Sequence, residues 1–209
     1  MIPFPYKLYL VISEADCKGK NMMDVARQAI KGGVDIIQLR EKNASVIEFT
    51  TKALQLTALA NEYQIPLIIN DNLMVAEHVN AAGIHVGNND LPPAEIRREW
   101  SAANKIIGYS IEYIEQLHNE QMEAADYLGI SPVFGTATKT DTVTEWGLEG
   151  ITTIRQLTTK PLIAIGNMQL NNVKAVIDAG ADCIAVVSAI CSAANPEKAA
   201  YDLKNEILK

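Results

Sequence analysis

Short apolar runs alternate with amphipathic segments along the whole chain. Eight of these runs are almost continuous in apolar residues, which is the pattern of parallel strands covered on both faces. The predicted strands are KLYLVIS (7–13), DIIQLRE (35–41), PLIINDN (66–72), GIHVG (83–87), KIIGYS (105–110), YLGISP (127–132), PLIAIGN (161–167) and CIAVVSAI (183–190). The segments between them have helical spacing. In residues 46–63 the apolar positions that fall largely on one side are Val46, Phe49, Ala53, Leu54, Leu56, Leu59 and Ala60.

Eight strand–helix units can form an open, doubly wound sheet or a closed barrel. An open sheet would place a glycine-rich turn after its first strand, but residues 11–24 contain no GxGxxG. A closed barrel instead carries polar residues at the carboxyl ends of many strands. Such residues follow the predicted strands at 38–42, 70–72, 90, 110, 136–139, 166–167 and 188. The sequence therefore predicts an α/β fold, a (β/α)₈ TIM barrel, with residues 1–209 as a single domain.

Composition and charge limit the classes of molecule that the protein is expected to bind. The chain has 48% hydrophobic and 21% charged residues, which is ordinary for a globular protein with a large core. Its formal net charge of −7 argues against a broad nucleic-acid surface, so any anion site must lie in a few loops. No apolar run approaches the roughly 18 residues that span a bilayer, and the start lacks the order of a signal peptide.

Cysteine usage indicates a reducing compartment. Cys17, Cys183 and Cys191 are an odd number without CxxC spacing, and they are interpreted as reduced thiols. We therefore expect a cytoplasmic protein that binds neither nucleic acid nor membrane. The sequence leaves the oligomeric state open.

Two cations follow the second predicted strand. Positions two apart on a strand face the same way, so Gln38, Arg40 and Lys42 can all point into the mouth of a barrel. Two cations there are costly to bury unless they meet an anion. The alternative is a solvated or salt-bridged strand end, with Glu41 and Asp71 as the partners.

Two carboxylates, Asp71 and Asp90, follow the third and fourth predicted strands. Adjacent barrel loops bring such positions together, and carboxylates beside a cluster of cations suggest a magnesium ion held between protein and phosphate oxygens. Magnesium takes few protein ligands and keeps substrate oxygens and waters. The alternative is local, with Asp71 capping the next helix and Asp90 opening a turn.

Three further segments give weaker signals for anion binding. The polar stretch 135–147 is interpreted as a mobile active-site loop, and its residues 135–139 offer hydroxyls, backbone amides and an ammonium group. Gly166 after strand seven and Val187–Ser188, placed in strand eight, match barrel positions where phosphate often meets backbone amides. The alternatives are a polar loop without function, a tight turn at Gly166 and ordinary packing in strand eight.

None of the histidines has the sequence context of a catalytic residue. His78 and His118 fall on helical segments and are expected at the surface. His85 lies within strand four, where it is expected to pack or to support a neighbour. The chain has no Ser/His/Asp order, HExxH or Walker loop.

Taken in order, these segments resemble the thiamine phosphate synthase family over nearly the whole chain. The matching pieces are QLREK (38–42), ND (70–71), GIHVGNND (83–90), IGYS (107–110), SPVFGTATK (131–139), AIG (164–166) and AVVSAI (185–190). Each piece alone is modest. Seven in this order, each at a predicted strand end, are specific.

The resemblance implies a (β/α)₈ fold and a magnesium-assisted transferase reaction of thiamine biosynthesis. In that reaction the pyrophosphate of a hydroxymethylpyrimidine leaves, and the ring nitrogen of a thiazole phosphate takes its place. By similarity, the residues that bind the pyrimidine pyrophosphate would be Gln38, Leu39, Arg40, Glu41, Lys42, Asn70, Ser110 and Lys139. Those that bind the thiazole phosphate would be Thr136, Ala137, Thr138, Gly166, Val187 and Ser188. The implied magnesium ligands are Asp71 and Asp90, and the implied catalytic residues are Arg40, Lys42, Ser110 and Lys139.

Two positions depart from the family pattern. Asn72 stands where the family usually has arginine after ND, which removes one nearby positive charge. Asn167 stands where a second glycine is usual after strand seven; asparagine tolerates positive φ but is bulkier. Both departures bear on the affinity for the thiazole phosphate.

Two other functions remain open. One is a related thiazole tautomerase, which transfers a proton and has no pyrophosphate to expel. Arg40, Lys42, Asp71, Asp90 and Lys139 argue for the synthase over this alternative. The other is a barrel that binds thiamine precursors as a regulator without turnover, for which Asn72 and Asn167 are the support.

Overall fold

A computed structural model describes residues 4–100, 104–135 and 144–209. Eight parallel strands form a closed barrel in which each strand pairs with the next and the last pairs with the first. The strands are β1 (Leu8–Ile12), β2 (Ile36–Leu39), β3 (Leu67–Asn70), β4 (Gly83–Val86), β5 (Ile106–Ile111), β6 (Tyr127–Ile130), β7 (Leu162–Ala164) and β8 (Cys183–Val186). The predicted barrel is confirmed, and the open sheet is excluded.

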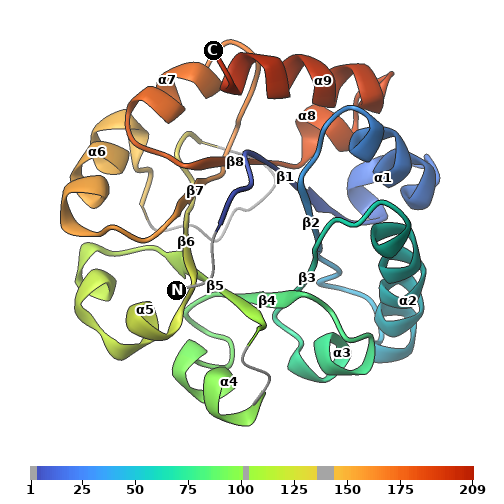
Figure 1. Cartoon of the computed structure of the whole chain (residues 1–209), viewed down its shortest axis with the longest axis horizontal. Coiled ribbons are helices and arrows are strands. Elements are labelled where there is room, and N and C mark those ends of the chain that lie inside the picture. The colour runs from blue at the N-terminus through green and yellow to red at the C-terminus, as the bar shows by residue number, and fades with distance from the viewer. Residues whose placement is uncertain (1–3, 101–103, 136–143) are drawn as a thin grey trace.

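Helices form a ring outside the strands (Figure 1). They are α1 (Met22–Lys31), α2 (Val46–Glu62), α3 (Leu73–His78), α4 (Pro93–Glu99), α5 (Glu120–Ala124), α6 (Gly147–Leu157), α7 (Val173–Asp178), α8 (Ser188–Cys191) and α9 (Pro196–Ile207). Two short 3₁₀ helices, η1 (Ala15–Cys17) and η2 (Ile114–His118), follow β1 and β5. None of the described helices is long and apolar enough to cross a membrane.

The core has two layers. A large cluster lies between the barrel wall and the helices, and a smaller one fills the barrel interior. The interior cluster consists of Tyr9, Val11, Ile36, Ile68, Ile106, Tyr127, Ile163, Cys183 and Ala185. The Phe4 ring packs against Tyr127, with 5.0 Å between ring centroids, and so adds a plug near the amino end of the barrel. Among the described residues, this packing fills the amino end of the barrel interior.

Two sequence predictions about elements are corrected. Strand β8 ends at Val186, so Val187 and Ser188 are not in a strand: Val187 is the N-cap of α8 and Ser188 its first residue. On α2, Val46 and Leu54 are about half exposed, at 49% and 48%, although both were placed on the buried side. The other five positions of that predicted face are buried.

Three aspartates fasten the amino ends of the strands. Asp35, Asp126 and Asp182 directly precede β2, β6 and β8. Their carboxylates accept hydrogen bonds from the backbone N–H groups of Leu8, Ile107 and Leu162, which lie at the starts of β1, β5 and β7. Each carboxylate also pairs with a cation from a surrounding helix: Lys204, Arg97 and Arg155, respectively. The opposite end of the barrel holds the cavity described next.

Candidate active site

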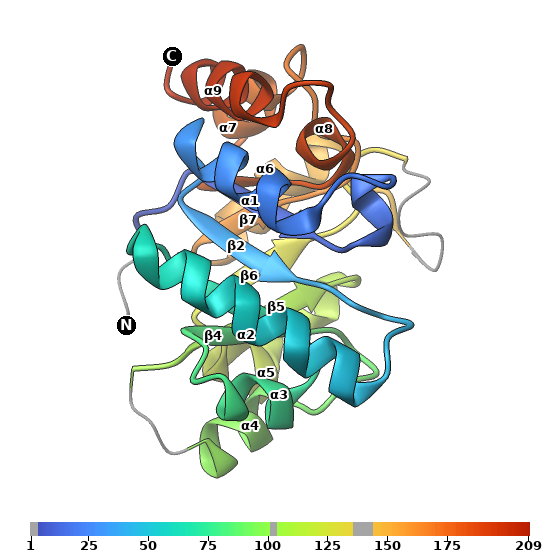
Figure 2. The ribbon, with the colours of Figure 1, turned by 90° about the vertical axis from the view of Figure 1, so that its right-hand side faces the viewer.

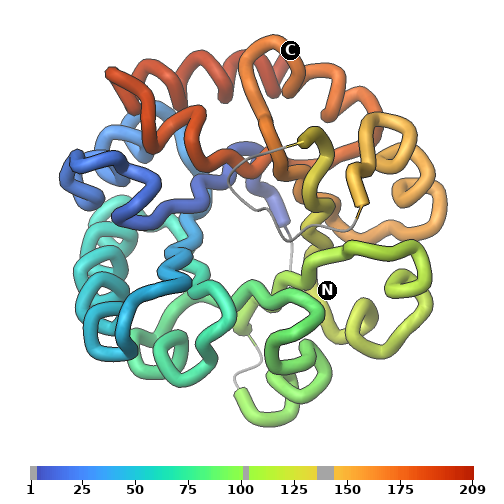
Figure 3. Tube along the Cα trace, turned by 180° about the vertical axis from the view of Figure 1, so that it is seen from behind, coloured from blue at the N-terminus to red at the C-terminus, as the bar shows by residue number. Residues whose placement is uncertain are grey.

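A cavity opens at the carboxyl ends of the strands, the end seen in Figure 3. In the side view of Figure 2 these loops lie opposite the amino terminus. Ten residues predicted from the sequence line this one cavity: Gln38, Arg40, Lys42, Asn70, Asp71, Asp90, Ser110, Gly166, Val187 and Ser188. They come from six different strand ends, so closure of the barrel is what brings them together.

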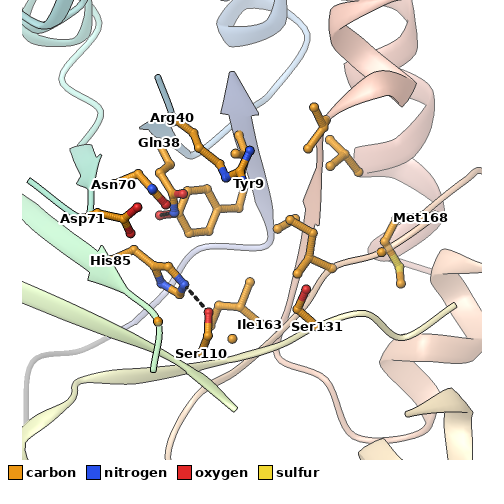
Figure 4. A pocket seen from close by; sticks show the side chains of 18 of the residues that line it. Tyr9, Gln38, Arg40, Asn70, Asp71, His85, Ser110, Ser131, Ile163 and Met168 are labelled. Atoms are coloured by element: carbon orange, nitrogen blue, oxygen red, sulfur yellow. Dashed lines mark hydrogen bonds between the residues drawn. The ribbon is translucent and has the colours of Figure 1, made fainter. Parts of the chain in front are cut away.

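Gln38 and Arg40 enter the cavity from the end of β2 (Figure 4). Strand β2 ends at Leu39, so Arg40 and Lys42 lie on the loop after it rather than on the strand. Both still line the cavity, as the alternation predicted. Among the described residues the Arg40 guanidinium has no carboxylate partner. Its donors are therefore available to an anion.

Lys42 has a partner within the site. Its Nζ lies 2.7 Å from Asp71 Oδ2, so the ion pair named as the alternative to anion binding exists. Lys42 is nevertheless 47% exposed and lines the cavity, and exposed pairs of this kind contribute little free energy. An incoming anion can therefore draw the ammonium away from Asp71 at small cost.

Leu39 and Glu41 are placed differently from their neighbours. The Leu39 side chain is fully buried in the outer core. Glu41 accepts a hydrogen bond from the Glu14 N–H and pairs with Lys52 at 3.1 Å. Neither lines the cavity, so the structure does not bring these two predicted residues to the site.

Asp71 and Asp90 face each other across two neighbouring loops. Asp71 has a φ of 60°, a left-handed conformation that aspartate tolerates better than most residues. Its N–H donates to the carbonyl oxygen of His85, which fixes the turn after β3 against β4. The Asp90 carboxylate accepts from the Gly87 N–H at 2.8 Å, so the predicted turn is present. Burial first, and then the neighbouring Asp71 carboxylate, raise the pKa of Asp90 above its ordinary value.

This donor set suits a magnesium ion. The Asp71 carboxylate helps to raise the pKa of Asp90, so a cation placed between the two carboxylates would favour the ionised form of Asp90. Within the described ranges, no group of three or more His, Cys, Asp and Glu side chains gathers around one point. A metal here would complete its shell with water and substrate oxygens, which is the habit of magnesium.

The opposite wall of the cavity is built from backbone turns. Gly166 and Asn167 have φ values of 116° and 51°, so the asparagine takes the positive φ that the family's glycine would allow. Val187 and Ser188 open α8, a short extra helix after the last strand. Barrel enzymes often hold a phosphate between the loops after strands seven and eight and the start of such a helix.

Asn72 has a structural role. Its side-chain Oδ1 accepts a hydrogen bond from the Val75 N–H at 3.0 Å and so caps α3. The cap after β3 is thus Asn72 and not Asp71, which leaves the Asp71 carboxylate directed to the cavity.

The predicted loop contacts lie mostly outside the described residues. Thr136, Ala137, Thr138 and Lys139 fall in the undescribed range 136–143. On its described border, the Thr144 hydroxyl donates to the Glu112 carbonyl oxygen at 2.9 Å. Glu112 is itself a cavity residue, so the end of this segment reaches the site.

A chain of polar side chains, which we call the floor chain, crosses the base of the cavity. It consists of Gln38, Tyr9, Tyr127, His85 and Ser110. Gln38 Nε2 donates to Tyr9 Oη at 3.0 Å, and Tyr9 Oη lies 3.0 Å from Tyr127 Oη. His85 joins the other end, with Nδ1 3.0 Å from Tyr127 Oη and Nε2 2.9 Å from Ser110 Oγ (Figure 4). Burial is the main cause that raises the pKa values of Tyr9 and Tyr127, so both phenols stay protonated.

The sequence did not identify Tyr9 and Tyr127 as site residues. A tyrosine inside an apolar strand resembles ordinary core, and only the barrel register places its hydroxyl at the cavity floor. His85 was expected to pack or support a neighbour, and its contact with Ser110 agrees with that expectation. His78 and His118 are exposed, as predicted.

The fold and the site together define a (β/α)₈ barrel whose mouth brings together cations, carboxylates and backbone turns. A sequence model described as thiamine monophosphate synthase matches residues 8–190. The thiamine-phosphate synthase of Albidiferax ferrireducens is 43% identical over 201 residues, which cover 96% of this chain and 91% of that protein. The one from Syntrophomonas wolfei is 41% identical and covers 98% and 97%.

Solved structures agree with these sequence matches. The thiamine phosphate pyrophosphorylase from Pyrococcus furiosus superposes with a TM-score of 0.86 at 32% identity, covering 98% of this chain and 96% of that one. The 3-hexulose-6-phosphate synthase from Salmonella typhimurium, at 18% identity and a TM-score of 0.71, shares the fold alone. The chain belongs to the thiamine monophosphate synthase family, and it is a transferase.

Proposed function

We propose that the protein condenses hydroxymethylpyrimidine pyrophosphate with thiazole phosphate to give thiamine phosphate and pyrophosphate; from the carboxylated form of the thiazole, CO₂ is lost as a third product. One observation carries this proposal: Arg40, Lys42, Asp71 and Asp90 meet at a single cavity. The backbone turns at Gly166 and Ser188 form its opposite wall. The wall of charged side chains fits the diphosphate of one substrate, and the wall of backbone turns fits the phosphate of the other.

The charged wall would receive the diphosphate of the pyrimidine substrate. The carbon–oxygen bond to the diphosphate breaks first, which leaves positive charge on the pyrimidine methylene and negative charge on the departing group. Arg40 and Lys42 would lower the energy of that charge separation. Lys139 is implied in the same role by the family resemblance.

Asp71 and Asp90 would hold magnesium, which neutralises diphosphate oxygens when it is bound. Lys42 pairs with Asp71 at 2.7 Å and is positioned to move from the carboxylate to the diphosphate. Asp90 must be ionised to serve as a ligand. The positive charge of Lys42 opposes the rise in the pKa of Asp90.

The second substrate needs no protein base. The thiazole ring nitrogen carries a lone pair and attacks the methylene directly, so no side chain has to remove a proton before the bond forms. Gly166, Val187 and Ser188 would hold the thiazole phosphate. Holding the nitrogen in line with the methylene then supplies much of the rate. The absence of a Ser/His/Asp triad from the sequence agrees with this chemistry.

A direct assay tests the proposal. Purified protein is mixed with both phosphorylated precursors and Mg²⁺, and thiamine phosphate and pyrophosphate are measured together. We expect equal amounts of the two products, and we expect both to disappear when a chelator is added. Tight thiazole-phosphate binding without pyrophosphate release would favour the regulator. Proton exchange on the thiazole without condensation would favour the tautomerase.

A further inference from the structure

The members of the floor chain are linked by consecutive hydrogen bonds, so their protons cannot be arranged independently. Among the described residues, Tyr9 Oη has two hydrogen-bond neighbours, Gln38 Nε2 and Tyr127 Oη. Tyr127 Oη likewise has two, Tyr9 Oη and His85 Nδ1. Each phenol has one proton to donate, and a neutral imidazole has one N–H and one acceptor nitrogen. All links must therefore point in the same direction along the chain.

The orientation of Gln38 sets that direction. Because Gln38 Nε2 donates to Tyr9, the Tyr9 hydroxyl must donate to Tyr127, and the Tyr127 hydroxyl to His85 Nδ1. The imidazole proton then lies on Nε2 and points to Ser110 Oγ. We propose that Tyr9 and Tyr127 are positioning residues that hold His85 in the Nε2–H tautomer. Through it they fix Ser110 as a donor toward the ligand, and at the other end of the chain the donation from Nε2 to Tyr9 leaves Gln38 Oε1 as an acceptor.

The strands are built around this chain. A Cβ at Gly108 would lie 2.1 Å from Tyr127 Cζ and 2.5 Å from His85 Nδ1. A Cβ at Gly129 would lie 2.9 Å from His85 Cε1. The two rings pack at 5.5 Å between centroids with planes 20° apart, in the space that these glycines leave. The contact between Tyr127 and His85 thus depends on glycine at two strand positions and is not incidental.

The two ends of the chain have opposite character toward the cavity. Gln38 keeps its Oε1 as an acceptor, and Ser110 keeps its hydroxyl proton as a donor. An aromatic edge with an amino group beside a ring nitrogen matches this pair, and the aminopyrimidine of the proposed substrate has such an edge. This assignment of the ligand rests on the proposed function, whereas the direction of the chain does not. The reverse direction would present a donor at Gln38 and would require the Nδ1–H tautomer of His85.

The tautomer can be measured without substrate. Uniformly ¹⁵N-labelled protein is studied by long-range ¹H–¹⁵N correlation above the ordinary pKa of histidine, about 6.5. With only three histidines in the chain, His85→Gln assigns the ring signals. We expect a pyrrole-type Nε2 and a pyridine-type Nδ1 in the wild-type protein. A wild-type Nδ1–H form or a charged ring would overturn the proposal.

Three Tyr→Phe variants distinguish an effect of the floor chain on the His85 tautomer from a general effect of packing. Tyr127→Phe removes the donor to Nδ1, so we expect His85 to become a mixture of tautomers. Tyr9→Phe removes the hydroxyl that orients Tyr127 but leaves the Tyr127 hydroxyl beside Nδ1, so we expect a smaller shift toward the Nδ1–H form than in Tyr127→Phe. Tyr109→Phe is the matched control. It removes a buried phenol on β5, which donates to Asn88 at 2.8 Å, without touching the floor chain. An unchanged tautomer in Tyr127→Phe would contradict the proposal.

A kinetic measurement extends the test to the ligand. Tyr127→Phe should raise KM for the pyrimidine pyrophosphate by about three- to tenfold, the effect of one hydrogen bond, with a smaller change in kcat. KM for the thiazole phosphate should stay the same. An unchanged pyrimidine KM in an active enzyme would overturn the role of the chain in recognition. A wild-type protein that makes no product would contradict the proposed function instead, and the tautomer measurement would still decide the direction of the chain.

Discussion

Arg40 is the residue on which the proposed diphosphate binding depends most directly. Its guanidinium lines the cavity, has no carboxylate partner among the described residues and shares the loop with Lys42. Two cations on one loop repel each other until an anion arrives. In contrast, Lys42 already has Asp71 beside it. Of these two cations, Arg40 is therefore the one that would gain its first anionic partner from the proposed diphosphate.

Replacing Arg40 with alanine should separate activity from stability. We expect Arg40→Ala to lower kcat/KM for the pyrimidine pyrophosphate by about 100-fold, because a donor to the leaving group is lost. The melting temperature should stay equal or rise, since no native ion pair is broken. Steady-state kinetics and a thermal melt measure the two effects. The control is Arg98→Ala, on the exposed face of α4, which should change neither. A large loss of stability in Arg40→Ala would show that the arginine is structural.

At the scale of elements, the two ends of the strands have different tasks. The amino ends are fastened by Asp35, Asp126 and Asp182, each joining a strand start to a cation from the helical ring. The carboxyl ends carry the left-handed Asp71 and Asn167 and the cavity, and the floor chain lies deeper in the barrel, at the base of that cavity. Fastening one end lets the other hold polar groups and strained turns, which lower stability.

Removing one fastening should destabilise the barrel. In Asp126→Ala the Ile107 N–H and the Arg97 guanidinium both lose a partner in a position where Asp126 is only 12% exposed. We expect the free energy of unfolding to fall by about 1–3 kcal/mol in urea titrations followed by circular dichroism. Asp202→Ala is the matched control, because it breaks an exposed pair with Lys198 on α9 and should change stability by less than about 0.5 kcal/mol. Equal losses in the two variants would mean that Asp126 is not a fastening.

The sequence predicted the elements better than the directions of their side chains. Eight apolar runs were enough for eight strands, and polar residues at strand ends were enough for the mouth of the barrel. The predictions for the end of β8 and for the burial of Val46 were wrong. Both concern apolar residues at the boundary of an element, where hydrophobicity alone does not show where the chain turns. Tyr9 and Tyr127 were missed because inward and outward positions differ only by register, which a single sequence does not show.

At the scale of the whole molecule, closure of the barrel is what makes the site. Arg40, Asp71, Asp90 and Ser110 come from the neighbouring strands β2 to β5, and Ser188 joins them in one cavity because β8 pairs with β1. A net charge of −7 leaves no general attraction for anions, so the cations of this mouth must do that work locally. The central claim is that the mouth holds a divalent cation and a diphosphate together.

The most direct test is a crystal structure with Mn²⁺ and pyrophosphate, with anomalous diffraction used to locate the metal. Manganese substitutes for magnesium at oxygen ligands and gives a signal that magnesium does not. The account predicts an anomalous peak between the carboxylates of Asp71 and Asp90, with the diphosphate bridging that metal and the Arg40 guanidinium. A metal bound elsewhere, or a diphosphate held away from Arg40 and Lys42, would contradict it.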